Sequence, residues 1–213
     1  RRTHVPSPKL VAFNRALADE FGVADLDYRA GSDHGLTDWL ITERAVQTVR
    51  PEVTIDGPTW QRICARVEEA LVTPPPGDDP LYLRLPGIPT TLEALRDAGY
   101  RLGIVTGNVA STAMHKLAAA GIDRGLFDGA VGFGDHGRER AQILRLALAR
   151  AGDEPLLVLG DTPRDLEGAE QVGLPFLGVG TTVLTVDHLA AARTPAVWLP
   201  DLGDADAVRE AVV

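Results

Sequence analysis

The chain has little of three things: cysteine, long apolar runs and positive charge. Its one cysteine, Cys64, excludes an internal disulfide and a zinc site built from several cysteines. The uninterrupted apolar runs are short, such as Leu156–Leu159, so no segment is expected to span a membrane. With 21 basic against 30 acidic residues, the formal net charge is −9, which argues against a nucleic-acid or anionic-lipid partner.

What the chain does contain is typical of a folded globular protein. Its 213 residues are 45% hydrophobic and 24% charged, enough for one large domain or a core domain with a smaller insert. The opening segment Arg1–Pro6 is followed by no apolar stretch, so we do not expect it to be a signal peptide. A cytoplasmic location is the default expectation. Because the first residue is Arg1, we expect the chain to start partway through a longer polypeptide.

The second half, from Pro80 onward, alternates between apolar strands and amphipathic helices. Between the strands, helical stripes end at glycines, as Arg138–Ala151 does before Gly152. The expected strands are Tyr100–Val105, Phe127–Phe133, Leu156–Leu159, Pro175–Val179 and Ala196–Leu199. This alternation predicts an α/β fold, a doubly wound parallel sheet with helices on both faces.

The first half reads as helices without strands. Apolar residues recur on one helical face from Leu10 to Phe21 and again from Trp60 to Leu71. The Pro- and Gly-rich stretch Thr73–Pro80 is the clearest linker in the chain. We therefore predict an all-helical unit over residues 10–79 and an α/β core over residues 80–213.

Polar residues follow the first expected strand, where ligands bind in open parallel sheets. Thr106, Gly107 and Asn108 place a hydroxyl, a glycine and an amide at a helix start, and this combination suits a phosphate group. Alternatively, Thr106 or Asn108 merely caps the following helix, which on these residues alone is the commoner outcome.

Two carboxylates follow the third expected strand. Asp161 and Asp165 lie four residues apart, and their hard oxygen atoms suit Mg²⁺. The alternative is that Asp161 caps the helix that begins near Pro163, while Asp165 offsets the helix dipole. That alternative competes well for Asp165 and less well for Asp161.

A basic residue opens the helix that follows the second expected strand. A cation opposes the dipole at a helix start, so Arg140 calls for a reason, and a bound anion would be one. A solvated arginine is an equal alternative. If Arg140 points away from the other residues, the basic role passes to Arg138 or Lys116.

Taken together, these motifs resemble those of the haloacid dehalogenase-like hydrolases. Gly103–Asn108 looks like the second motif of that family, Gly160–Asp165 like its fourth, and Arg140 like the basic residue of its third. The early helical block resembles the cap of phosphoglycolate phosphatase-type members, and residues 1–9 resemble the core loop that precedes this cap. The resemblance implies a Rossmann-like core with an inserted helical cap, and Mg²⁺ as cofactor.

The resemblance also implies roles for these residues. Thr106, Gly107, Asn108 and Arg140 would bind the phosphoryl group, while Asp161 and Asp165 would serve the metal. The implied activity is a Mg²⁺-dependent phosphatase acting on a small phosphorylated metabolite through an aspartyl-phosphate intermediate.

The first motif of the family, D-x-D-G-T, does not occur in these residues. Because that motif supplies the nucleophile, we expect the nucleophile upstream of Arg1, and we expect the 213-residue chain alone to be inactive. Two alternatives stay open: a phosphosugar mutase of the same fold, and a non-catalytic anion-binding relative. The sequence leaves the substrate and the oligomeric state undetermined.

Overall fold

The computed structural model describes residues 7–23, 26, 34–71, 85 and 87–212. The predicted linker Thr73–Pro80, the boundary at residues 79 and 80, and residues 1–6 of the predicted core loop lie outside the described residues. The described α-helices are α1 (Pro8–Phe21), α2 (Asp38–Gln47), α3 (Gly57–Ala70), α4 (Ile88–Asp97), α5 (Ala110–Ala119), α6 (Arg140–Ala151), α7 (Pro163–Val172), α8 (Val186–Ala190) and α9 (Ala205–Ala211). The described strands are β1 (Ile104–Val105), β2 (Val131–Gly132), β3 (Val158–Gly160), β4 (Phe176–Val179) and β5 (Ala196–Leu199).

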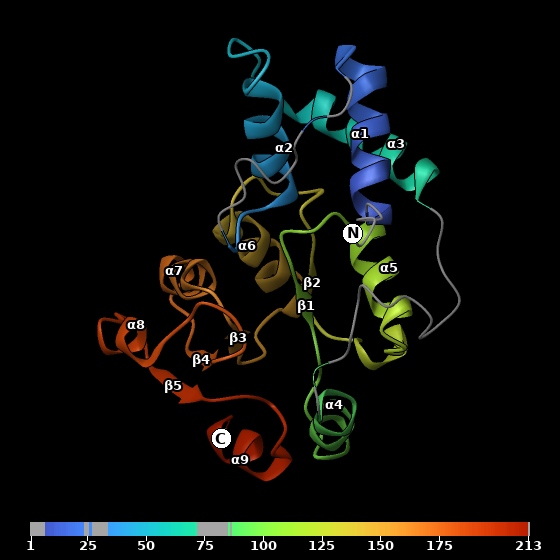
Figure 1. Cartoon of the computed structure of the whole chain (residues 1–213). Coiled ribbons are helices and arrows are strands. Elements are labelled where there is room, and N and C mark those ends of the chain that lie inside the picture. The colour runs from blue at the N-terminus through green and yellow to red at the C-terminus, as the bar shows by residue number, and fades with distance from the viewer. Residues whose placement is uncertain (1–6, 24–25, 27–33, 72–84, 86, 213) are drawn as a thin grey trace, which may run out of the picture.

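Local signals set the limits of the first three helices. Ser7, Thr37 and Asp56 each accept a hydrogen bond from a backbone N–H in the first turn of the helix that follows. Helix α1 ends where Gly22 adopts a left-handed conformation at φ 67°, which costs a residue with a side chain more than it costs glycine. The three helices form the upper part of the molecule in Figure 1.

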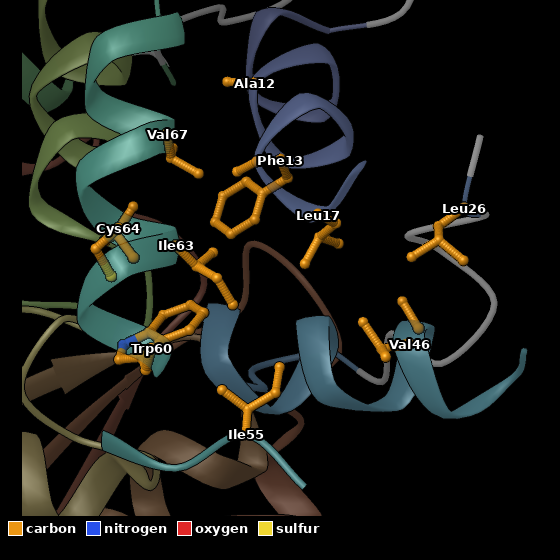
Figure 2. Close-up of a cluster of buried hydrophobic side chains, with 13 residues drawn as sticks. Ala12, Phe13, Leu17, Leu26, Val46, Ile55, Trp60, Ile63, Cys64 and Val67 are labelled. Atoms are coloured by element: carbon orange, nitrogen blue, oxygen red, sulfur yellow. The ribbon is translucent and has the colours of Figure 1, made fainter. Parts of the chain in front are cut away.

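The buried faces of α1 and α3 meet in one apolar core (Figure 2). Phe13 and Leu17 from α1 pack with Trp60 from α3, and all three side chains are fully buried. Rings of Trp39 and Trp60 stack with their centroids 5.3 Å apart. The predicted apolar faces of these helices are therefore confirmed. Val109, which immediately precedes α5, belongs to the same cluster and joins this core to the rest of the chain.

All strand pairs in the described residues are parallel, as predicted. Strand β1 pairs with β2, while β3, β4 and β5 form a separate group in that order. Helices α5 and α6 lie on opposite sides of β1 and β2 in Figure 1. The α/β fold class is thus confirmed, and Ala196–Leu199 is a strand over its whole predicted length.

The strands differ from the prediction in length and grouping. Only Ile104–Val105 and Val131–Gly132 are strands within the two longer runs predicted there. Strand β4 is buried throughout, whereas Leu159 in β3 is 40% exposed. Among the described residues, β1 pairs only with β2 and β3 only with β4.

One hydrogen bond ties the helical core to the loops that follow the strands. The Trp60 indole Nε1 donates to the Gly134 carbonyl at 2.9 Å, and Gly134 N–H donates to the Asn108 carbonyl at 2.8 Å. The packing of α3 is thereby linked to the turn after β1.

None of the described helices combines the length and the apolar character that a membrane span requires.

We predict that Trp60→Ala lowers the free energy of unfolding by about 3–5 kcal/mol. The substitution opens a cavity in a fully buried position and leaves the Gly134 carbonyl without its donor. Urea unfolding measures the change. The side chain of Val11 in α1 is 53% exposed, so Val11→Ala is the control and should change the free energy of unfolding by less than about 0.5 kcal/mol. A loss below about 1 kcal/mol for Trp60→Ala would contradict the packing described here.

Candidate active site

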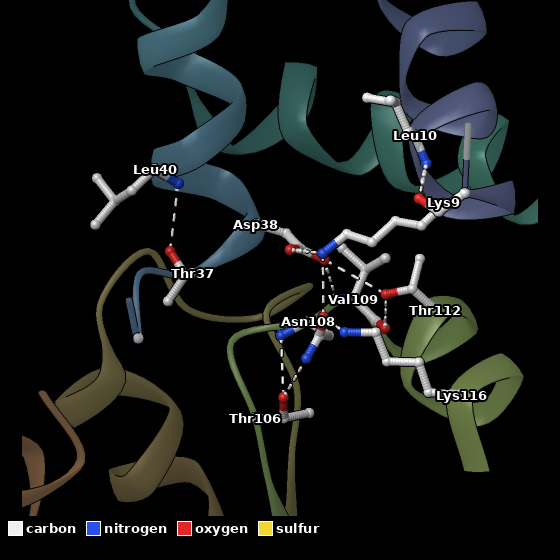
Figure 3. A network of polar contacts seen from close by, with 12 residues as sticks. Lys9, Leu10, Thr37, Asp38, Leu40, Thr106, Asn108, Val109, Thr112 and Lys116 are labelled. Atoms are coloured by element: carbon white, nitrogen blue, oxygen red, sulfur yellow. Dashed lines mark hydrogen bonds and ion pairs between the residues drawn. The ribbon is translucent and has the colours of Figure 1, made fainter. Parts of the chain in front are cut away.

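The turn after β1 is held together by the side chains that the sequence singles out. Thr106 N–H donates to the Gly132 carbonyl at 3.0 Å, which continues the pairing of β1 with β2. The Thr106 hydroxyl oxygen accepts Asn108 Nδ2 at 2.7 Å and Asn108 N–H at 3.2 Å (Figure 3). The N-cap residue of α5 is Val109, so neither Thr106 nor Asn108 caps that helix.

Two carboxylates from elsewhere in the chain cap α5 instead. Asp38 Oδ2 accepts Val109 N–H at 3.0 Å, and Asp135 Oδ2 accepts Ala110 N–H at 2.5 Å. The Asp38 N–H also donates to the Gly107 carbonyl at 2.7 Å. Burial raises the pKa of Asp135, although its hydrogen bond from Ala110 works against that shift. The start of α5, predicted to hold an anion, therefore already holds protein carboxylates.

Two lysines reach the same turn (Figure 3). Lys9 Nζ lies 2.5 Å from Asp38 Oδ1 and donates to Asn108 Oδ1 at 3.1 Å. Lys116 Nζ donates to the same Asn108 oxygen at 2.8 Å. Burial, together with repulsion from Lys9, lowers the pKa of Lys116 to about 8, and the attraction of Asp38 only partly offsets this.

A second polar cluster follows β3. Arg140, the first residue of α6, places Nε 3.0 Å from Asp165 Oδ1, and both side chains are largely buried. Asp165 Oδ2 accepts Thr162 N–H at 3.1 Å and the Thr162 hydroxyl at 2.7 Å, which closes a capping box at α7. Asp165 therefore has the capping role that the sequence left open, and Arg140 is not a solvated side chain.

Asp161 lies in the turn between β3 and α7. The helix N-cap is Thr162, so Asp161 does not cap α7. Its Oδ2 accepts the Thr181 hydroxyl at 3.0 Å, and its carbonyl accepts Leu184 N–H at 3.1 Å. These bonds fix the turn after β3 to the segment that follows β4.

The two predicted metal ligands do not by themselves form a Mg²⁺ site. Both oxygens of Asp165 are engaged by Arg140 and Thr162, while Asp161 has one oxygen bonded to Thr181. Within the described ranges, no group of three or more His, Cys, Asp or Glu side chains could hold a metal ion. A cation that favours six oxygen ligands needs more than these residues offer.

The alternative basic residue Arg138 faces α2. Its Nη2 donates to Glu43 Oε1 at 2.8 Å, and Glu43 is almost completely buried. The Arg138 carbonyl accepts the Thr37 hydroxyl at 2.6 Å. Arg138 thus joins the loop before α6 to α2, whereas Lys116, the other alternative, reaches the Thr106 turn.

The short segment that leads into α2 runs between the two polar clusters. Arg140 Nη2 donates to the Gly35 carbonyl at 3.3 Å. A Cβ atom built on Gly35 would lie 2.5 Å from Thr162 Oγ1, and one built on Gly107 would lie 2.8 Å from Thr37 Cα. Because two residues of chain span at most about 7 Å, the turns after β1 and β3 lie at the same end of the molecule.

The structure brings some of the predicted site residues into contact with one another, but not all of them. Thr106 and Asn108 form one cluster and Arg140 and Asp165 another, and no direct bond between Thr106, Asp161 and Arg140 is found among the described residues. Their convergence on one ligand therefore stays a prediction. Lys9, Asp38 and Asp135 were missed because each comes from a different segment.

Comparison with known proteins shows which family the chain resembles. The sequence profile of the haloacid dehalogenase-like hydrolases matches residues 8–173. The pyrophosphatase PpaX of Bacillus velezensis is 33% identical over 118 residues, which cover 54% of each chain. The probable phosphatase IndB of Dickeya dadantii is 32% identical over 119 residues, which cover 54% of this chain and 51% of IndB.

A solved structure extends the likeness to nearly the whole chain. A hydrolase from Pseudomonas syringae superimposes with a TM-score of 0.62 at 17% identity and covers 97% of this chain and 92% of that one. This likeness concerns the fold, and the matched segment spans only about half the length of PpaX and IndB. The profile match covers most of the chain, and the protein therefore belongs to the haloacid dehalogenase-like hydrolase family.

Proposed function

We propose that the protein is a phosphatase that acts on a small phosphorylated metabolite. The observation that carries this proposal is the state of the Thr106 hydroxyl. Its oxygen accepts two hydrogen bonds from Asn108, and no acceptor for its proton is found among the described residues. A fixed hydroxyl with a proton to donate, at the end of a parallel strand, suits a phosphoryl oxygen.

The neighbouring groups have roles that follow from their contacts. Asn108 orients the Thr106 hydroxyl, while Gly107 would donate its backbone N–H to the phosphoryl group. Arg140 would complete the phosphoryl site from the second cluster, and its ion pair with Asp165 sets the direction of its guanidinium group. The helices of residues 10–79 would form the cap that selects the substrate and excludes water.

The chemical step is assigned to no described residue. Asp161 is the carboxylate placed best to contribute one ligand to Mg²⁺, the cofactor that the family resemblance implies, but the described residues do not complete its site. The aspartyl-phosphate nucleophile belongs to a D-x-D-G-T motif that the 213 residues lack. A phosphosugar mutase remains the alternative within the same fold, and a cytoplasmic location is part of the proposal.

We predict that the 213-residue chain does not hydrolyse an aryl phosphate in the presence of Mg²⁺. The same chain, preceded by an added strand that ends in D-x-D-G-T, should hydrolyse it. Asp161→Ala should abolish that activity, because Asp161 would be a metal ligand, whereas Asp153→Ala, which removes an exposed carboxylate, should not. Release of the aryl alcohol measures turnover. Activity of the unextended chain would place the nucleophile within these residues and refute the assignment.

We also predict that the unextended chain binds Mg²⁺ weakly. Mg²⁺ loses its water molecules reluctantly, and one carboxylate with an available oxygen compensates little of that cost. Titration calorimetry should therefore show at least about tenfold tighter binding by the extended chain, equal to about 1.4 kcal/mol. Equal affinities for the two chains would show that the described residues form the metal site alone.

A further inference from the structure

The two lysines at the Thr106 turn stand out from the composition of the chain. Of 21 basic residues only two, Lys9 and Lys116, are lysines, and all the others are arginines. They are 107 positions apart in the sequence, yet both ammonium groups donate to the same Asn108 oxygen. Both lysines of these 213 residues therefore lie at the same turn.

This meeting point is unfavourable for two like charges. Lys116 is partly buried, and repulsion from Lys9 is among the causes that lower its pKa. The side chain of Lys9 is 16% exposed. An anion bound between the two ammonium groups would offset their repulsion, which a neutral amide oxygen does only in part.

Asp38 supplies an internal carboxylate at the same place. Its side chain is 2% exposed and accepts from three different donors: Lys9 Nζ, Val109 N–H and, at 3.4 Å, the Thr112 hydroxyl. An ammonium, a backbone N–H at a helix start and a hydroxyl also form a donor set that suits a phosphoryl oxygen. Figure 3 shows the Asp38 carboxylate between Lys9 and the first turn of α5.

We propose that Lys9 and Lys116 form a two-lysine binding site for a phosphate dianion, and that Asp38 occupies this site until the ligand displaces it. The inference rests on the proposed function, which it deepens by adding a cationic pair and a carboxylate that competes with the substrate. Ligand binding then requires the first turn of α2 to move away from the turn after β1.

The attachment of α2 fits such a movement. Among the described residues, two hydrogen bonds hold the first turn of α2 besides the Asp38 side chain: Asp38 N–H to the Gly107 carbonyl at 2.7 Å, and the Thr37 hydroxyl to the Arg138 carbonyl at 2.6 Å. Trp39, in the same turn, stacks on Trp60. Thr37 lies against Gly107, so a small shift of this segment opens the β1 end. The displaced carboxylate would become exposed to water.

The first test measures binding of inorganic phosphate to the full 213-residue chain by titration calorimetry. Asp38→Asn, which keeps the shape but removes the charge, should bind phosphate about tenfold more tightly, because the competitor is weakened. Lys116→Gln and Lys9→Gln should each bind at least about tenfold more weakly, while Lys116→Arg should stay within about threefold of the wild type. Arg101→Gln removes an exposed cation far from the site and is the matched control.

These binding measurements test the two-lysine site independently of whether the protein is a phosphatase. Weaker binding by Asp38→Asn would show that Asp38 only positions Lys9, and unchanged binding by both glutamine variants would remove the lysines from the site. Either result overturns the inference, even if the extended chain is an active phosphatase. The predicted pattern supports it even without turnover. Phenyl phosphate, titrated in parallel, distinguishes a site for esters from one for free phosphate. If a glutamine variant does not fold, the phosphate affinities of Asp38→Asn and Lys116→Arg still test the inference.

A second prediction concerns protons. Among the described residues, Lys9 and Asp38 are the charged groups that shift the pKa of Lys116, and its pKa of about 8 leaves it largely neutral at pH 9. A bound dianion favours the charged form and raises this pKa, so phosphate binding at pH 9 should take up protons. Lysine-selective ¹³C labelling gives two side-chain resonances, and phosphate should shift the titration of the Lys116 resonance upward. A titration unaffected by saturating phosphate would overturn the inference.

Discussion

The first N–H groups of α5 need hydrogen-bond acceptors, and the residues that supply these acceptors hold several other segments in place. Val109 at the N-cap offers no side-chain oxygen, so Asp38 and Asp135 supply the acceptors from distant segments. Asp38 is the first residue of α2 and pairs with Lys9 of α1. The hydrogen bond that it accepts at the start of α5 therefore attaches both α1 and α2 to α5. The buried Trp60 indole completes the attachment through Gly134. The helical part and the strands are therefore held together by polar groups at the edge of an apolar core.

Local sequence predicted what local forces determine. Helix limits followed from caps and glycines such as Gly22, and the apolar faces around Phe13 and Trp60 followed from spacing. Strand length did not follow, because apolar runs such as Tyr100–Val105 are paired over only two residues. Pairing depends on a neighbouring strand, which no pattern within the run itself records.

The sequence predicted the part of the site that lies on one strand end, but not the part that comes from distant segments. Thr106 and Asn108 follow a strand, and a strand end can be recognised in sequence. Lys9 and Asp38 could not be placed, because their proximity to Asn108 depends on how α1 and α2 pack against the core. One signal was available: lysine is scarce in a chain rich in arginine, and unlike arginine it can lose its charge when buried. The acidic net charge of the whole chain gave no hint of a cationic centre.

The stacked indoles of Trp39 and Trp60 give the protein an optical consequence. They lie at the junction between the helices and the strand ends, and the Trp60 N–H is bonded to the loop carbonyl of Gly134. The third tryptophan, Trp198, packs in a different apolar cluster beside β5. Separation of the helices from the strands would break the indole hydrogen bond and admit water, so the emission of two tryptophans would change while that of Trp198 would not. Intrinsic fluorescence thus reports opening of this junction in the unmodified chain.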